Sequence, residues 1–253
     1  MLNLTIDGIP VQVPEGTTLL EAARQCGIWI PTLCHHESLT PYGGCRLCVV
    51  EVRERKVTHI VASCTAGARN GLEVVTCSDT LLSIRKGIVS LLLAEVPQSP
   101  VLQELGAAFG VTGDTRYTPR NDSCIACGRC IRACREIVGV SAIDFAYRGY
   151  KKVPAPPFFE RSESCIGCGT CVAVCPTGAI TMHDIQAGIY SRAPDGSIIE
   201  GPARIIDNWK VSFPLKTCSR CGEPFVPQAV LDHCAIYAKL PADFFELCRE
   251  CRQ

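Results

Sequence analysis

The sequence predicts an α+β protein assembled from several small modules. The 19 cysteines among 253 residues fall into three groups, at 26–77, 124–175 and 218–251. The cysteine-free stretch 78–123 carries apolar residues at helical spacing. Short runs that alternate apolar and polar residues indicate strands elsewhere. We therefore expect four parts, at 1–78, 79–116, 117–185 and 186–253.

The first part has the pattern of a small mixed sheet. Residues 2–6 alternate apolar and polar side chains, and Asp7-Gly8 is a typical turn before Val11 and Val13. Thr17 or Thr18 can cap a helix that begins at residue 19 and ends near residue 27. Further strands are expected at 49–52 and 57–62. Two strands, a helix and further strands predict a β-grasp fold.

The second part reads as a helical connector. Asp79 is a plausible N-cap, and apolar residues follow at helical spacing until Pro97 and Pro100 stop the helix. A second helix is expected at 101–109, ending at Gly110.

The third part contains two matching cysteine runs. Each has the spacing Cys-x2-Cys-x2-Cys-x3-Cys, and the second is followed by Pro176. Bacterial ferredoxins with two [4Fe–4S] clusters have this spacing. Tetrahedral zinc is the alternative, but zinc needs only four ligands per site and does not account for two matching four-cysteine runs. We predict two [4Fe–4S] clusters.

The same spacing predicts which cysteines share a cluster. Three thiolates on a tight loop reach three corners of one cluster, and the fourth, one helical turn further on, points towards the other cluster. The first predicted set is Cys124, Cys127, Cys130 and Cys175, and the second is Cys165, Cys168, Cys171 and Cys134. This crossed ligation makes the clusters neighbours, which suits electron transfer.

The first cysteine group indicates a [2Fe–2S] centre. Cys34 precedes a Cys45-x2-Cys48 loop, and a distant fourth cysteine, Cys64 or Cys77, would close the set. Histidine ligands, as in Rieske centres, are the alternative, but His35 and His36 are adjacent rather than in separate motifs.

The last group consists of Cys218-x2-Cys221 and Cys248-x2-Cys251, separated by a helical pattern at 228–240. Two such knuckles predict a small zinc-ribbon-like module. A redox-active iron or a further Fe–S centre, with Cys234 as a candidate ligand, is the alternative, and a site without metal is the third reading.

Three stretches resemble a known family. TLLEAARQCGIWIPTLCHHESLTPYGGCRLCVVEV, RYTPRNDSCIACGRCIRACREIVGVSAIDFAYRGY and CIGCGTCVAVCPTGAI resemble the N-terminal iron–sulfur region of the complex I large iron–sulfur subunit. The same region occurs in iron-only hydrogenases and in diaphorase subunits of NAD-linked hydrogenases and formate dehydrogenases. The resemblance covers about residues 1–182. It implies a β-grasp [2Fe–2S] domain, a two-[4Fe–4S] ferredoxin domain, and a partner flavoprotein that exchanges electrons with NAD(H).

The resemblance also decides between two cysteines. It implies that Cys64, rather than Cys77, is the fourth [2Fe–2S] ligand. We then expect Cys77, like Cys26, to be a buried free thiol.

The chain departs from this family in two respects. Many relatives hold an extra cluster through one His and three Cys between the two domains, but residues 91–114 here contain neither residue type. Only 77 residues follow Pro176, too few for a molybdopterin or hydrogen-cluster domain. We therefore expect a short relay subunit of a hydrogenase, with electron bifurcation as one version, whose catalytic metal lies on another chain.

Composition and missing motifs narrow the function. The formal net charge is zero, which gives no electrostatic reason to expect nucleic acid or an anionic membrane. No nucleotide-binding glycine motif, signal peptide or membrane-spanning run is evident, so we expect a non-catalytic cytoplasmic subunit. The expected partners are a flavin/NAD(H) subunit and a hydrogenase subunit, with formate dehydrogenase as the alternative. A stand-alone oxidoreductase and a zinc-binding interaction protein are the competing function classes.

Overall fold

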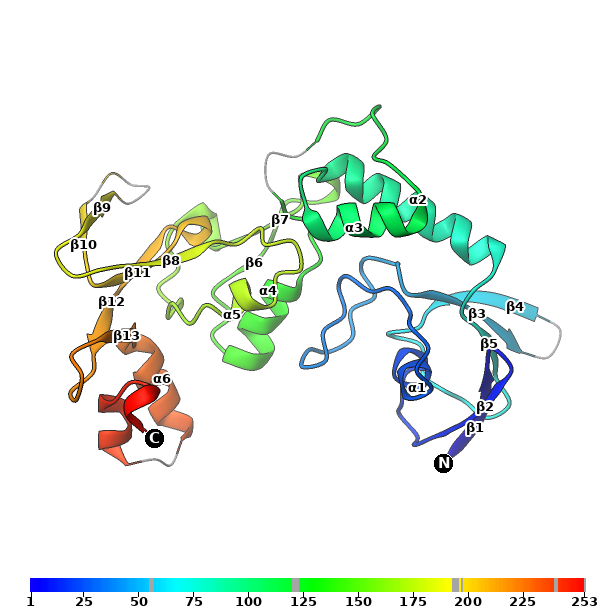
Figure 1. Ribbon diagram of the computed structural model, residues 1–253, viewed down its shortest axis with the longest axis horizontal. Helices are drawn as coiled ribbons and strands as arrows, with labels where there is room; N and C mark the ends of the chain where they lie inside the picture. The colour runs from blue at the N-terminus through cyan, green and yellow to red at the C-terminus, as the bar shows by residue number, and fades with distance from the viewer. Residues whose placement is uncertain (55–56, 120–122, 193–195, 197, 239–240, 253) are drawn as a thin grey trace. The chain divides into compact units, whose positions relative to one another are not determined.

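The computed structural model describes residues 1–54, 57–119, 123–192, 196, 198–238 and 241–252 (Figure 1). It contains two compact units. The first comprises residues 1–129 and 176–179, and the second comprises 130–175 and 180–253. Leu240, where the sequence predicts the last helix to end, lies outside the described residues.

The first unit contains the expected β-grasp sheet. Five strands lie in the order β2-β1-β5-β3-β4, and β1 pairs antiparallel with β2 but parallel with β5. The sequence missed β5 as a separate strand. The bounds are β1 Leu2–Ile6, β2 Ile9–Val13, β3 Val49–Glu54, β4 Val57–Ala62 and β5 Glu73–Val75.

Helix α1 (Leu19–Gln25) packs against this sheet with its aliphatic side chains buried (Figure 1). Thr18 is the N-cap. Its hydroxyl accepts the Glu21 backbone N–H at 3.2 Å, and the Glu21 carboxylate accepts the Thr18 N–H at 2.8 Å. This reciprocal capping box satisfies two amide donors at the start of the helix and fixes where it begins.

The connector forms helices α2 (Asp79–Glu95) and α3 (Pro100–Phe109), which pack against each other. The prediction of Asp79 as N-cap is wrong. Ser78 has the extended backbone of a cap, and its hydroxyl accepts the Leu81 N–H at 3.2 Å, so Asp79 is the first helical residue. Its charge there favours the helix dipole. Helix α3 ends as expected at Gly110, which has a left-handed φ of 63°.

The second unit begins with short elements around the cysteine runs. Helix α4 (Arg129–Arg132) continues into the π-helical turn η1 (Ala133–Val138), and the second run contains α5 (Thr170–Ala173). Two short strands lie between the runs, β6 (Asp144–Ala146) and β7 (Val153–Ala155), and they pair antiparallel. Two 3-10 turns, η2 (Gly149–Lys151) and η3 (Pro157–Phe159), accompany them.

After the second run the chain forms an antiparallel sheet that the sequence did not predict. Its order is β13-β12-β11-β8, and a separate hairpin pairs β9 with β10. The bounds are β8 Met182–Ile185, β9 Tyr190–Arg192, β10 Ile198–Glu200, β11 Ala203–Ile206, β12 Val211–Thr217 and β13 Pro224–Pro227. The turn η4 (Asp207–Trp209) joins β11 to β12.

The chain closes with α6 (Gln228–Tyr237), which lies where the sequence predicts a helix, and the short turns η5 (Ala242–Glu246) and η6 (Glu250–Arg252). Helix α6 packs against β12 and β13 (Figure 1). None of the helices in the described ranges is long and apolar enough to cross a membrane.

Candidate iron–sulfur centres

Three of the four predicted [2Fe–2S] ligands are buried in the first unit. Cys34, Cys48 and Cys64 are at most 1% exposed, and Cys45 is half-buried. Cys77, the rejected candidate, is exposed on the surface, so the expectation that it is a buried thiol is wrong. Residue 77 follows β5 and directly precedes the cap of α2, where the chain leaves the sheet.

These four cysteines form two hydrogen-bonded pairs. Cys34 pairs with Cys45, and this bond lowers the pKa of Cys45 to about 5 and raises that of Cys34. Cys48 pairs with Cys64 in the same way, with the pKa of Cys48 lowered to about 6 and that of Cys64 raised. Two pairs of cysteine sulfurs, once deprotonated, are the ligand set that two irons need.

The surrounding backbone holds this site in shape. The Cys45 N–H donates to Cys34 Sγ at 3.4 Å, and the next residue, Arg46, has a left-handed φ of 60°. A non-glycine residue there is strained, so the loop conformation is imposed by its surroundings. Next to Cys64, Ser63 Oγ donates to the Cys48 carbonyl at 2.8 Å. Arg85 of α2, 6% exposed, reaches the Val49 carbonyl at 2.7 Å.

The two histidines beside Cys34 differ in their surroundings. His35 is buried, and burial lowers its pKa. His36 Nδ1 accepts the Ser38 N–H at 3.2 Å, so it caps a local turn. Cys26 is half-buried at the C-cap of α1.

The two cysteine runs repeat one backbone conformation. The residue before the second cysteine is left-handed in both, with φ of 48° at Ala126 and 71° at Gly167. The residue after it is also left-handed in both, with φ of 73° at Gly128 and 76° at Gly169. In the first run this turn aims the Ala126 N–H at Cys124 Sγ, 3.3 Å away. The sequence repeat is therefore a structural repeat as well.

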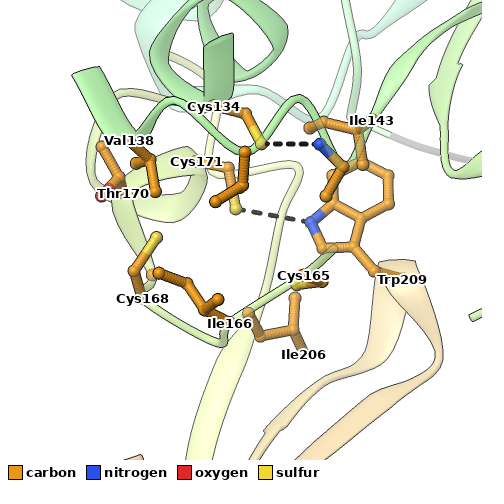
Figure 2. A pocket seen from close by; sticks show the side chains of 13 residues that line it. Cys134, Val138, Ile143, Cys165, Ile166, Cys168, Thr170, Cys171, Ile206 and Trp209 are labelled. Atoms are coloured by element: carbon orange, nitrogen blue, oxygen red, sulfur yellow. Dashed lines mark hydrogen bonds between the residues drawn. The ribbon is translucent and has the colours of Figure 1, made fainter. Parts of the chain in front are cut away.

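A cavity in the second unit collects four cysteines from both runs (Figure 2). Cys134 comes from the π-helical turn η1, and Cys165, Cys168 and Cys171 come from the second run. Apolar side chains complete the lining. Thus the structure brings together the four residues that the crossed pattern groups.

Backbone and side-chain N–H groups point at cysteine sulfurs lining this cavity. The Ala142 backbone donates to Cys134 Sγ at 3.2 Å, and the Trp209 indole donates to Cys171 Sγ at 3.4 Å (Figure 2). Burial raises the pKa of Cys134 and Cys165, and raises that of Cys171 to about 11. Cysteine binds metal as a thiolate, so metal binding would release the protons of these thiols. Converging sulfurs, aimed N–H donors and an apolar wall fit a [4Fe–4S] cluster.

The other predicted set is divided between the two units. Cys124 and Cys127 belong to the first unit, and Cys130 and Cys175 belong to the second, where both contact its apolar core. Their joint ligation of one cluster stays a prediction.

The sulfur atoms of the four C-terminal cysteines form one cluster. The sulfurs of Cys218, Cys221, Cys248 and Cys251 all lie within 4.8 Å of one another. The Cys248 N–H donates to Cys218 Sγ at 3.3 Å, and Gly222 turns the first knuckle with a φ of 77°. Backbone N–H groups lower the pKa of Cys218 to about 6. Cys234, on α6, is exposed and is not a member of this group.

The spacing of these sulfurs suits a single ion. A tetrahedral site with metal–sulfur bonds of about 2.3 Å places its sulfurs about 3.8 Å apart. Cys221 Sγ and Cys248 Sγ are 3.7 Å apart. In a four-iron cluster each cysteine binds a different iron, which holds the sulfurs farther apart. The geometry therefore fits one tetrahedral ion, and zinc and iron both accept four thiolates.

Family models match most of the chain. A 2Fe-2S iron-sulfur cluster binding domain matches residues 1–79, and a 4Fe-4S dicluster domain matches residues 120–182. A second 4Fe-4S dicluster model matches residues 158–234 and extends into the unpredicted sheet.

A solved structure supplies the decisive comparison. One chain in the crystal structure of an NAD+-reducing [NiFe]-hydrogenase in the H2-reduced state is 31% identical, with a TM-score of 0.59. The match covers 70% of this chain and 86% of that one. This chain belongs to the family of iron–sulfur subunits that includes this hydrogenase chain. The family also includes the NADH-ubiquinone oxidoreductase 75 kDa subunit of Reclinomonas americana, 30% identical over 72% of this chain. A third member is the NADP-reducing hydrogenase subunit HndD of Solidesulfovibrio fructosivorans, 34% identical over 73% of this chain.

The curated members of this iron–sulfur family are much longer than the matched region. The chain spans 29% of the Reclinomonas subunit and 36% of HndD. The shared part is therefore the cluster-binding region.

Proposed function

We propose that this chain is an electron-relay subunit with one [2Fe–2S] and two [4Fe–4S] clusters and no catalytic site of its own. The observation that carries the proposal is the cavity lined by Cys134, Cys165, Cys168 and Cys171. Cys134 and Cys165 are 31 positions apart along the chain and line the same partly open cavity. This arrangement is not expected of a zinc knuckle and supports the crossed ligation proposed for a two-cluster ferredoxin.

The proposed ligands follow the sequence predictions. The [2Fe–2S] set has the paired thiols described above, and the first [4Fe–4S] set rests on the cysteine spacing alone. The sets are Cys34, Cys45, Cys48 and Cys64 for [2Fe–2S], Cys124, Cys127, Cys130 and Cys175 for one [4Fe–4S], and Cys165, Cys168, Cys171 and Cys134 for the other. We also retain the division into parts at 1–78, 79–116, 117–185 and 186–253.

The clusters, when bound, supply one-electron redox chemistry. The chain's own residues do three things for them. Thiolates fix each cluster in place, backbone and indole N–H groups donate to sulfur, and apolar side chains such as Ile143 and Ile206 exclude water. All three set the reduction potential.

For the C-terminal site we propose a single structural zinc ion held by Cys218, Cys221, Cys248 and Cys251. Four sulfurs within 4.8 Å of one another support one ion rather than a cluster. Zinc has no redox chemistry, so this site would hold the end of the chain in place rather than carry electrons.

The proposed partners are a flavin subunit that reacts with NAD(H) and a catalytic hydrogenase subunit. The hydrogenase assignment is supported by the 86% coverage of a chain from an NAD+-reducing [NiFe]-hydrogenase. Electron bifurcation is a further version of this proposal.

The relay is tested by metal analysis of the anaerobically purified chain. We expect about ten irons and about ten acid-labile sulfides per polypeptide, with EPR signals from both cluster types after reduction. The chain should show no NADH oxidation alone. About four irons or fewer without sulfide would overturn the proposal, and NADH activity of the isolated chain would replace it with a stand-alone enzyme.

The partners are tested by anaerobic purification from the native source. A co-purifying nickel–iron subunit together with a flavoprotein supports the hydrogenase complex. A molybdopterin subunit would instead assign the chain to a formate dehydrogenase.

The zinc site is tested with Cys248→Ser, using Cys234→Ser as the matched control because Cys234 is exposed and outside the four-sulfur group. Cys248→Ser should lose about one zinc and keep all EPR signals, whereas Cys234→Ser should keep its zinc. Loss of one iron instead of zinc would make this site a redox centre.

A further inference from the structure

The unpredicted sheet supplies part of the wall of the cysteine cavity. Ile206 ends β11, and Trp209 ends the turn η4 that leads into β12. Both side chains line the cavity beside Cys165 and Cys171, as Figure 2 shows. They are 1% and 4% exposed. The sheet therefore contributes to the cluster site and is more than an appendage.

Trp209 makes a specific polar contact there. Its indole Nε1–H donates to Cys171 Sγ across 3.4 Å (Figure 2). Among the residues that the structure describes, the other hydrogen bonds to sulfurs of this cavity come from backbone N–H groups, such as that of Ala142. Trp209 is therefore a donor that a side-chain substitution can remove, whereas the backbone donors stay.

The indole is held in place from several sides. Ile206, Val211 and Phe213 belong to the same buried cluster as Trp209 and Cys171. The turn itself is fixed by Asn208, whose side-chain oxygen accepts the Thr181 N–H at 2.9 Å, and by Lys210, whose φ of 52° is left-handed. Phe213 also packs so closely on Gly167 that a Cβ there would lie 2.5 Å from its ring. The sheet and the cysteine loop are thus fitted to each other.

A donor in this position acts on the redox state. Reduction adds a negative charge to the cluster, and part of that charge resides on the cysteine sulfurs. An N–H aimed at sulfur stabilises the reduced form more than the oxidised form, which raises the reduction potential. Exclusion of water acts in the opposite direction, because a dry site disfavours the additional charge. A variant that keeps the ring but loses the N–H separates the two effects.

We propose that Trp209 is a positioning residue that raises the reduction potential of the [4Fe–4S] cluster bound by Cys134, Cys165, Cys168 and Cys171, through its hydrogen bond to Cys171. This rests on the proposed relay function. The sheet β8–β11–β12 is then the scaffold that carries the donor. The potential of this one cluster is set from outside the cysteine runs.

The test compares Trp209→Phe with Trp29→Phe in the full chain. The chain has two tryptophans, and Trp29 is 69% exposed, so its replacement is the matched control. EPR-monitored redox titration should show one [4Fe–4S] signal shifted to lower potential in Trp209→Phe. The expected change in its reduced-to-oxidised ratio is up to about tenfold, or about 59 mV for one electron. The other signals, and all signals of Trp29→Phe, should stay unchanged.

A second measurement covers the case in which Trp209→Phe loses its cluster. With ¹⁵N-indole tryptophan in the Trp29→Phe background, pulsed EPR of the reduced protein should detect ¹⁵N coupled to a [4Fe–4S] cluster. An unchanged midpoint with intact clusters overturns the inference, and so does absence of the ¹⁵N coupling. A wild-type chain without iron and sulfide overturns the relay function itself, so the two failures are distinguishable.

Discussion

The cores of the two compact units differ in residue composition. In the first, the core around β1–β5 and α1 is mainly aliphatic, with Leu20, Val50 and Ile6 fully buried and the proposed ligands Cys48 and Cys64 among them. In the second, cysteine is central, because Cys130 and Cys171 belong to the core and three further cysteines pack against it. Aliphatic packing stabilises a fold by itself, whereas cysteines in a core add stability when they bind metal. The comparison predicts that the stability of the second unit depends on metal more than that of the first.

The sharpest test of this contrast is anaerobic removal of all metal. We expect amides of the second unit to lose nearly all protection from hydrogen exchange, because metal binding contributes about 10–16 kcal/mol even in small zinc-binding peptides. The strands β1–β5 should remain protected. Exchange measured by mass spectrometry checks this, with the reconstituted chain as the control. Equal loss in both units would break the comparison.

The aliphatic core is tested with Leu20→Ala. Leu20 is fully buried on α1, so the truncation should cost about 2–5 kcal/mol of the free energy of unfolding of the β-grasp part. Leu91→Ala is the control, because Leu91 is 53% exposed and its truncation should cost about 0.5 kcal/mol at most. Urea-dependent hydrogen exchange of β1–β5 measures both. Similar losses in the two variants would contradict the assignment of this core.

The fit between cysteine loop and sheet is tested with Gly167→Ala. The new Cβ would meet the Phe213 ring at 2.5 Å, and the backbone φ is 71°. We expect a loss of about 2–4 kcal/mol from overpacking and left-handed strain together. Gly188→Ala is the control, since Gly188 has a φ of 75° but nothing within 4 Å, and it should lose only about 1–2 kcal/mol.

Urea unfolding of the reduced, cluster-loaded protein measures the free energy of unfolding of each glycine variant. Iron content should also fall in Gly167→Ala alone. Equal effects would mean that the contact with Phe213 has no energetic role.

The smallest effect is expected at the capping box of α1. Thr18→Ala removes one side of the box and should cost about 1 kcal/mol at neutral pH. The Thr18 backbone N–H holds the pKa of Glu21 below its ordinary value of 4.5. A lowered carboxyl pKa stabilises the fold above pH 4.5, and this contribution is lost as the pH falls below that value.

The Thr18 hydroxyl also donates to the Glu21 carboxylate at 2.9 Å, and Thr18→Ala removes this bond while keeping the backbone N–H. The difference between wild type and Thr18→Ala should therefore shrink near pH 4. Hydrogen exchange of the α1 amides, corrected for intrinsic rates at each pH, measures it. A difference that is the same at pH 7 and pH 4 would show that the bond from the hydroxyl to Glu21 does not contribute.

Local patterns were enough to predict most elements of the first unit. The alternation at residues 2–6, the Asp7-Gly8 turn and the Thr18 cap each act within a few residues, and the structure follows them. The short strand β5 was not predicted, because three residues are too few to show a periodic pattern. Its position depends on parallel pairing with β1, which is distant in sequence. The cap of α2 was assigned one residue late, since Ser78 and Asp79 are both good cap residues.

The cysteine spacing likewise indicated which cysteines line the cavity, because cluster ligation requires particular spacings between the ligands. It also indicated the four C-terminal sulfurs that meet. What it did not contain was Trp209, whose contact with Cys171 spans 38 positions and depends on a sheet of short strands. A single tryptophan after Asp207-Asn208 carries no motif, so only the fold could reveal it.

The cavity described above draws on residues from Cys134 to Trp209. During synthesis, a ribosome that has translated the second cysteine run has not yet produced the indole that donates to it. A nascent chain of that length can gather sulfurs but cannot shelter what they hold from oxygen and water. If the proposed cluster binds here, its site is complete only after residue 209 has left the exit tunnel.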